Sequence, residues 1–379
     1  MPSIHKTVYY SYTTGKLPKG CELCVQGKKL VLFITGDCFR KCFYCPLSEI
    51  RRTDKVFANE WDTGFTNKLE KKHLDIIIKE AKLCGAEGAG ITGGDPLIQW
   101  QRTVKAIKAL KKEFGKNFHI HLYTGFEHVE PKRLKALCNA GLDEIRFHPV
   151  LWNDTLWNRI DIARKFPWTI GVEIPSIPSY EKQTKKLLHF LDHKVDFVNM
   201  NELELSDTNA SMLRKLKYEA KDKTSYAVKG SKALALRLMR DPHSYPIHFC
   251  TSKLKDKVQL TQRIRRRAKR IALPFDTITK DGLLIRGVAY LPDLEPGFSY
   301  RKRLQSLTPV EKNNVLKRLR EKQAKLPLQS IIDHEKLRLL CDPQELFKKR
   351  KDVKRLRLLP AIVEEYPTRD GMEVDIRML

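Results

Sequence analysis

Short apolar runs alternate with helical patterns along the first 210 residues. Six runs predict buried strands, and they begin at residues 30, 88, 119, 144, 169 and 197. Between them, apolar residues recur every three or four positions, which predicts helices over 67–84, 97–114, 131–140, 153–166 and 180–191. Right-handed crossovers of this length curl a parallel sheet, but six units do not close an eight-stranded barrel. We therefore expect an α/β fold, a partial (β/α)6 barrel over residues 26–210.

The pattern changes from residue 211 onward. Helical spacing predominates over 232–240, 253–272 and 343–358, and Thr308-Pro309-Val310-Glu311 forms a capping box that opens another helix. Strand patterns are limited to 283–290 and a terminal hairpin around Asp370-Gly371. We expect three parts: an N-terminal segment (1–25), the barrel (26–210) and a basic, mostly helical C-terminal extension (211–379).

Composition narrows the class of protein. The 379 residues are 41% hydrophobic, which allows a large core, yet no apolar run approaches the ~20 residues of a membrane span. The N-terminus lacks the apolar block of a signal peptide, so we expect a cytoplasmic protein without membrane contact.

Positive charge is in large excess. The 72 Lys and Arg against 45 Asp and Glu give a net charge of +27. Residues 251–379 carry +14 (31 basic, 17 acidic), so the C-terminal third is about twice as dense in positive charge as the rest. Such an excess favours a polyanionic partner, and we expect an RNA, most simply tRNA.

Five of the nine cysteines lie within the first 45 residues. Cys38, Cys42 and Cys45 form a C-x3-C-x2-C loop directly behind the first apolar strand. Three thiolates on one short loop hold three irons of a cubane cluster and leave the fourth iron open to an outside ligand. Zinc sites more often pair their cysteines as two C-x2-C knuckles, so the spacing favours the cluster.

This loop, with Tyr44 before its third cysteine, resembles the signature of the radical SAM superfamily. A second motif, Thr92-Gly93-Gly94-Asp95-Pro96, ends the second strand and resembles the superfamily's GGEP element, with Asp in place of Glu. The resemblance implies a [4Fe-4S] cluster whose open iron chelates S-adenosylmethionine. An external electron donor such as ferredoxin or flavodoxin would drive its cleavage to a 5′-deoxyadenosyl radical, in an oxidoreductase or a transferase.

Polar residues at the other strand ends are candidates for the rest of the cofactor pocket, because barrel sites lie at the carboxyl mouth. The cofactor-binding residues that we predict are Tyr44, Gly93, Gly94, Asp95, Pro96, Thr124, His148, Glu173 and Asn201. The alternative for each strand-end residue is a hydrogen-bonded core group. No catalytic residue is assigned.

A further pair of cysteines, Cys21 and Cys24, has the spacing of half a metal site. The residues of ligand character that would complete it in space are His248 and Cys250, more than two hundred residues away. Three interpretations stay open: a zinc site, an auxiliary iron–sulfur cluster, or buried thiols without a metal.

Arginines recur at helical spacing in the segment after residue 253. Arg263, Arg266, Arg267 and Arg270 occupy positions i, i+3, i+4 and i+7, which predicts a cationic stripe that contacts RNA phosphates.

Two alternatives remain for the function. The sequence Phe43-Tyr44-Cys45-Pro46 also resembles enzymes that place a radical on a glycine of a partner protein, and a non-catalytic, metal-stabilised RNA-binding protein is the other.

Overall fold

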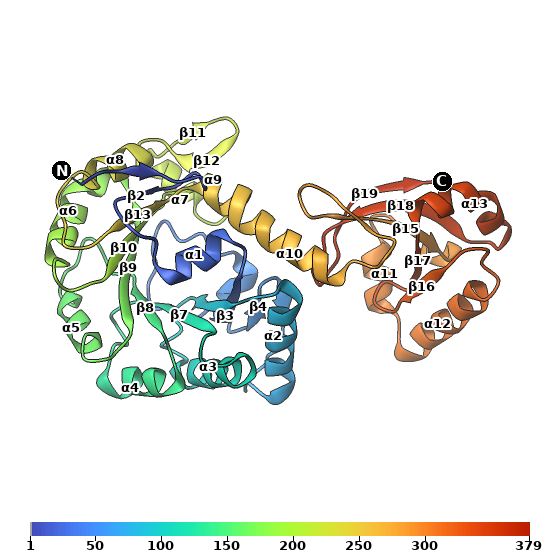
Figure 1. The fold of residues 1–379 in the computed structure, drawn as a ribbon, viewed down its shortest axis with the longest axis horizontal. Helices are drawn as coiled ribbons and strands as arrows, with labels where there is room; N and C mark the ends of the chain where they lie inside the picture. Colours follow the sequence, from blue (N-terminus) through green and yellow to red (C-terminus); the bar gives the residue numbers. More distant parts are fainter. Residues whose placement is uncertain (1) are drawn as a thin grey trace. The chain divides into compact units, whose positions relative to one another are not determined.

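The computed structural model describes residues 2–379. The chain forms two compact units, Met1–Arg263 and Ile264–Leu379, which we describe separately. Figure 1 shows the first unit in blue to yellow and the second in orange to red.

A curved sheet forms the centre of the N-terminal unit, with most helices around the outside and one short helix inside the curve (Figure 1). Its strand order is β1-β2-β13-β10-β9-β8-β7-β6-β3-β4-β5, and the seven strands from β13 to β3 run parallel. The parallel strands are β3 (Lys29–Thr35), β6 (Gly88–Gly93), β7 (His119–Thr124), β8 (Glu144–Phe147), β9 (Thr169–Ser176), β10 (Phe197–Glu202) and β13 (Ile247–Cys250). The short strands at the edges are β1 (His5–Lys6), β2 (Tyr12–Thr13), β4 (Phe57–Ala58) and β5 (Trp61–Asp62).

The helices follow the strands as the alternation predicts. They are α2 (Lys71–Cys84), α3 (Trp100–Phe114), α4 (Pro131–Ala140), α5 (Ile160–Ala163), α6 (Glu181–Phe190), α7 (Ala210–Lys215) and α8 (Ser231–Leu238). The segment predicted as a long helix over 153–166 contains only a short 3-10 turn, Trp157–Arg159, and α5. There the Trp157 indole donates to the Val150 carbonyl (3.1 Å), which fixes this segment as a compact turn.

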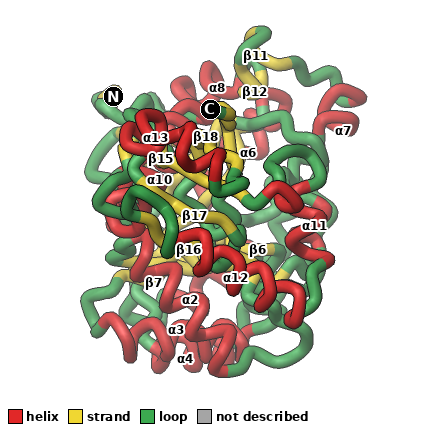
Figure 2. The backbone as a smooth tube through the Cα atoms, turned by 90° about the vertical axis from the view of Figure 1, so that its right-hand side faces the viewer, coloured by secondary structure: helices red, strands yellow, loops and turns green. Residues whose placement is uncertain are grey.

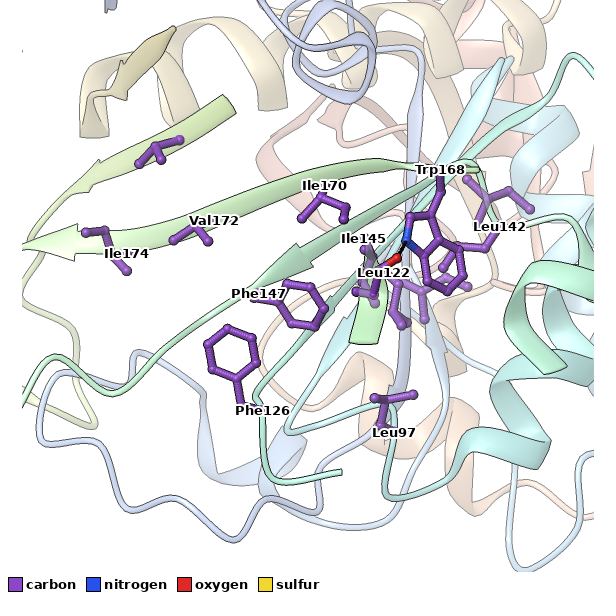
Figure 3. Close-up of a cluster of buried hydrophobic side chains, with 14 of the residues drawn as sticks. Leu97, Leu122, Phe126, Leu142, Ile145, Phe147, Trp168, Ile170, Val172 and Ile174 are labelled. Atoms are coloured by element: carbon purple, nitrogen blue, oxygen red, sulfur yellow. Dashed lines mark hydrogen bonds between the residues drawn. The ribbon is translucent and has the colours of Figure 1, made fainter. Parts of the chain in front are cut away.

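The parallel strands have an apolar outer face and a polar inner face, because successive side chains point to opposite sides of a strand. On β8 and β9 the outward residues are Ile145, Phe147, Ile170, Val172 and Ile174, which form part of the apolar cluster in Figure 3. The residues between them, Arg146 and Glu173 among them, face the interior of the curved sheet, where they meet. One face therefore packs against helices, while the other builds a charged lumen.

A short helix, α1 (Lys19–Val25), enters this lumen. It contacts β3, β6 and β7 on their inner side. A Cβ atom on Gly20 would lie 2.5 Å from Arg146 Nη2, and a Cβ on Gly88 would lie 2.7 Å from Leu23, so both glycines are needed for this close packing. The predicted N-terminal segment is thus part of the barrel unit.

The boundary of the barrel differs from the prediction. The six predicted strands are all present, but β13 adds a seventh, and the first unit ends at Arg263 instead of residue 210. β13 has only four residues and follows Pro246, so it lacks the long apolar run that identified the other strands. Among residues 2–379, the parallel strands do not close into a barrel.

The C-terminal unit is built on a six-stranded antiparallel sheet, which corrects the expectation of a mostly helical extension. Its strands are β14 (Thr277–Ile278), β15 (Leu284–Tyr290), β16 (Ser330–Asp333), β17 (Arg338–Cys341), β18 (Leu359–Glu365) and β19 (Glu373–Met378). Its helices are α11 (Tyr300–Ser306), α12 (Pro309–Gln323) and α13 (Pro343–Arg355), and Figure 2 shows α12 beside β16 and β17. Of these strands, β15 matches the strand predicted over 283–290, whereas β14, β16 and β17 were missed because each has four residues or fewer. The capping box at Thr308 and the terminal hairpin are confirmed.

The segment predicted as one helix over 253–272 is continuous but not uniform. It runs as α9 (Ser252–Leu254), a π-helical stretch (Lys255–Leu260) and α10 (Thr261–Ile271). Two short strands, β11 (Ala220–Asp222) and β12 (Ser225–Val228), form a separate hairpin in the N-terminal unit. Among residues 2–379, none of the helices combines the length and apolar character that crossing a bilayer needs.

We expect Phe147→Ala to lower the free energy of unfolding of the N-terminal unit by about 3–5 kcal/mol, because a buried aromatic leaves a cavity. Phe147 is fully buried and stacks on Phe126 at a centroid distance of 4.8 Å. Thermal unfolding followed by circular dichroism measures the effect. Val8→Ala, at an 86% exposed position, is the control. Equal stability of both variants would contradict this packing.

Candidate metal and cofactor site

The loop with Cys38, Cys42 and Cys45 follows β3 and is anchored by one arginine inside it. Arg40 pairs with Glu127 through two bonds of 2.7 Å and also donates to the His148 carbonyl. A bidentate arginine–carboxylate pair fixes orientation as well as distance. The loop after β3 is therefore held against the ends of β7 and β8.

A chain of hydrogen bonds fixes Tyr44 and His148. The backbone carbonyl of Glu173 lies 2.6 Å from His148 Nδ1, so Nδ1 carries the proton and donates. Nε2 is then an acceptor, and the Tyr44 hydroxyl donates to it across 2.8 Å. Burial, with the nearby charge of Arg40, lowers the pKa of His148, which keeps the ring neutral for this arrangement.

The three thiols of the loop are suited to bind a cluster. All three are free; Cys38 is exposed, and Cys42 and Cys45 are half-buried. Burial raises the pKa of Cys38 and of Cys42, so without metal these thiols stay protonated, and binding of iron would release their protons. Asn209 donates to the Tyr44 carbonyl (3.0 Å) and closes the loop from the side of β10.

The glycines of the second motif bring the ends of β3 and β6 into direct contact. Gly93 has a φ of +143°, and a Cβ there would lie 2.2 Å from the Thr35 carbonyl oxygen. A Cβ on Gly94 would lie 2.1 Å from the Asp37 carbonyl oxygen. The Gly94 amide donates to Thr35 (2.8 Å), so the motif holds the first residues of the cysteine loop.

The side chain of Asp95 is used inside the protein. Its carboxylate accepts from the Thr124 hydroxyl (2.6 Å) and from the amides of Gly125 (3.2 Å) and Leu97 (3.0 Å). It therefore ties the end of β6 to the end of β7. The motif would therefore bind a ligand through its backbone groups. The Pro96 carbonyl accepts a hydrogen bond from the Thr103 hydroxyl.

Glu173 and Asn201 lie within a charged network in the lumen. Asn201 donates to one oxygen of Glu173 (2.9 Å), while Asn199 and Arg146 donate to the other (3.0 Å each). Burial raises the pKa of Glu173, but Arg146 and the two amides outweigh it and hold the pKa below its usual value. Arg146 also pairs with Glu144 at 2.5 Å, so its charge is balanced twice.

The second predicted cysteine set converges in the same lumen. A cavity of about 80 Å³ is lined by Cys21, Cys24, Val25, Lys29, Tyr123, Arg146, Glu173, Asn199, Asn201, His248, Cys250, Lys255 and Gln259. The residues that line it include all four predicted members of that set. None of the three loop cysteines lines it.

The arginines of the predicted stripe do not share one environment. Arg263 pairs with Glu60 and bonds to Asn59 Oδ1 at 3.0 Å. Arg267 is buried and donates to the Pro367 carbonyl. Arg266 is half-buried and Arg270 is exposed. Helical spacing alone therefore overstated the charge that faces solvent.

Sequence reasoning missed several residues that build the site. Arg40 and Glu127 position the loop, and Lys29 and Lys255 line the cavity. Arg40 could have been predicted, because a positively charged residue between two of the loop cysteines is visible in the sequence. Glu127 and Lys255 carry no such signal, because their partners are distant in sequence.

Comparison with known proteins places these features in a family. The family model described as "Radical SAM superfamily" matches residues 32–166, from β3 to the region of α5. A protein of Methanocaldococcus jannaschii, named "Putative glycyl-radical enzyme activating enzyme MJ0021", is 44% identical over 291 residues, 74% of this chain and 75% of that protein.

Solved structures give weaker likeness. Methylornithine synthase (PylB) is 14% identical with a TM-score of 0.37, covering 60% of this chain and 70% of its own. The radical S-adenosylmethionine methyltransferase TsrM from Kitasatospora setae is 11% identical with a TM-score of 0.35, covering 69% of this chain and 56% of its own.

We expect Glu127→Gln to weaken cluster retention by about 2 kcal/mol, because a charge-assisted bidentate pair is lost from the cysteine loop. The measurement is iron retained per chain against increasing chelator after anaerobic reconstitution.

The matched control is Glu49→Gln in the same loop. Glu49 pairs with Arg52 at 3.5 Å, with both side chains exposed, and such pairs contribute little. Iron loss at the same chelator concentration in both variants would contradict the role of the Arg40–Glu127 pair.

Proposed function

The chain belongs to the radical SAM superfamily, and on that premise we propose that it abstracts a hydrogen atom from a glycine of a partner protein. As a member, it is an enzyme that uses a [4Fe-4S] cluster and S-adenosylmethionine. The M. jannaschii relative supports the proposal, because its name states activation of a glycyl-radical enzyme and the match spans 74% of this chain.

Cys38, Cys42 and Cys45 would hold the cluster, which supplies one electron to cleave S-adenosylmethionine into methionine and a 5′-deoxyadenosyl radical. Hydrogen-atom abstraction would yield 5′-deoxyadenosine and a glycyl radical, and an external donor such as ferredoxin or flavodoxin would supply the electron. The residues of this chain position the reactants: Arg40 and Tyr44 fix the loop, and the glycine motif presents backbone groups beside it.

Aromatic side chains cover part of the loop. Phe43 contacts the rings of Tyr180 and Trp152 at centroid distances of 6.1 and 6.0 Å, and it meets the buried Tyr44 ring at 5.1 Å. Exclusion of water protects a carbon radical from side reactions.

An exposed apolar rim at the carboxyl ends of the strands favours a protein partner. Phe39 and Ile50 in the loop after β3 are 72% and 69% exposed, Trp152 after β8 is 48% exposed, and Met212 and Leu216, in and just after α7, are 46% and 48% exposed. Loops after parallel strands meet at one edge of the sheet. Exposed apolar residues gathered at such an edge are typical of protein interfaces.

Incubating the reduced enzyme anaerobically with S-adenosylmethionine and a purified glycyl-radical enzyme tests the proposal. We expect a carbon-centred protein radical in the EPR spectrum, whose hyperfine splitting collapses when glycine is deuterated at Cα. Consumption of S-adenosylmethionine without a protein radical would contradict the proposed substrate.

We expect Met212→Glu to weaken binding of that partner about tenfold, since it places a charge in the apolar rim. Sedimentation or calorimetric titration measures the affinity. Val310→Glu, at a 69% exposed position in α12, is the matched control. Equal affinity of both variants would remove the rim as the contact surface.

RNA is a second candidate substrate, supported by the exposed basic face of α13. Lys348, Lys351 and Lys354 are exposed and recur every three residues along this helix. This spacing lets neighbouring charges follow a phosphate backbone. The comparisons lend this candidate no support, and the protein-partner proposal is the stronger.

If RNA binds there, Lys348→Ala with Lys351→Ala should reduce the slope of log affinity against log salt by about 2, because each phosphate contact releases close to one counterion. Filter binding measures the slope. An unaltered slope, together with an unchanged nucleoside profile in cells lacking the protein, would eliminate RNA.

A further inference from the structure

Three thiols and one imidazole from distant parts of the chain line one cavity in the N-terminal unit. Cys21 and Cys24 lie one turn apart on α1, and His248 and Cys250 share a side of β13. We propose that these four side chains bind a zinc ion, separate from the cluster held by the loop after β3. The set Cys3His supplies all four ligands of a closed tetrahedral structural site.

The unpartnered imidazole of His248 is an observation independent of the cysteine spacing. His248 is 4% exposed, and neither Nδ1 nor Nε2 has a hydrogen-bond partner. Burying an unpaired polar atom is unfavourable, and a metal bond would satisfy one nitrogen.

The surroundings of Cys21 favour its thiolate form once a metal is present. Arg146 Nη1 lies 3.5 Å and Asn199 Nδ2 lies 3.3 Å from its sulfur, and both groups donate. Lys29 adds a positive charge to the same cavity. Three thiolates, a neutral imidazole and Zn²⁺ carry a net charge of −1, which these cations complement.

Carboxylate ligands are less available here than sulfur. Glu173 is the one carboxylate among the residues that line the cavity, and three N–H donors already bind its two oxygens. The thiols and the imidazole form the donor set that zinc prefers over magnesium or calcium.

Binding requires side-chain rotation. Among residues 2–379, no three His, Cys, Asp or Glu side chains are already gathered at metal-binding geometry, and this includes the loop cysteines Cys38, Cys42 and Cys45. The cavity of about 80 Å³ leaves room for the four side chains to turn inward.

Zinc at this position would join α1 to the last parallel strand. α1 lies in the lumen, where Gly20 allows close contact with Arg146 and His121. The backbone connects α1 to β3, Val25 of α1 already packs with Cys250 of β13, and the ion would add metal–ligand bonds between these two elements. The site therefore has a structural role in retaining α1 inside the lumen.

Metal analysis of the full-length triple variant Cys38→Ser, Cys42→Ser, Cys45→Ser tests the proposal, because this variant cannot hold the loop cluster. We expect about one zinc per chain and no iron. Adding Cys21→Ser with Cys24→Ser should abolish zinc binding, whereas adding Cys138→Ser, a half-buried thiol of α4, should leave it unchanged.

If the variant with all five Cys→Ser changes does not fold, cobalt substitution tests the site with fewer changes. In the triple variant, Co²⁺ should give thiolate charge-transfer absorption, which single changes Cys24→Ser and His248→Gln weaken or shift. Iron lost on changing Cys21 and Cys24 would contradict zinc and show a second cluster instead. Absence of both metals, or zinc indifferent to all these changes, would overturn the site.

Discussion

The direct contact between the ends of β3 and β6 is the constraint on which the site depends. Gly93 and Gly94 approach the carbonyls of Thr35 and Asp37 so closely that no Cβ fits between them. This contact fixes the position of the first residues of the cysteine loop beside the glycine motif. Asp95 then extends the same connection to β7. The backbone around the loop is thereby set before any ligand binds, and preorganisation of this kind lowers the free-energy cost of binding.

The lumen shows a second constraint, the burial of charge. Arg146 is almost fully buried and is stabilised by Glu144 and Glu173. Asn199 donates to the Glu173 oxygen that also binds Arg146, and Asn201 donates to the other Glu173 oxygen. A buried charge that lost its partners would destabilise the protein by about 3–5 kcal/mol. The network therefore needs all its members, and it accounts for polar residues at positions where a simple barrel core would be apolar. It also places hydrogen-bond donors beside Cys21.

Strand alternation, glycine turns and cysteine spacing are local signals, and they predicted the six central strands, the cysteine loop and the capping box at Thr308. Features set by distant contacts were not predictable. β13 could not be recognised in the sequence, because it has only four residues and follows a proline. Its pairing with β10 nevertheless brings Cys250 toward Cys21. In the C-terminal unit, β16 and β17 were missed because they are short and because charged residues such as Arg338 are buried in ion pairs within the sheet. Arg267 was placed on a solvent face, yet its guanidinium bonds a buried carbonyl.

The central claim is that the loop after β3 holds a cluster with one iron open to S-adenosylmethionine. EPR spectroscopy of the anaerobically reconstituted and reduced protein tests it most directly. The account predicts a reduced [4Fe-4S] signal whose g values and line shape change when S-adenosylmethionine is added, and no such signal in Cys42→Ser. A spectrum that is identical with and without S-adenosylmethionine would contradict it.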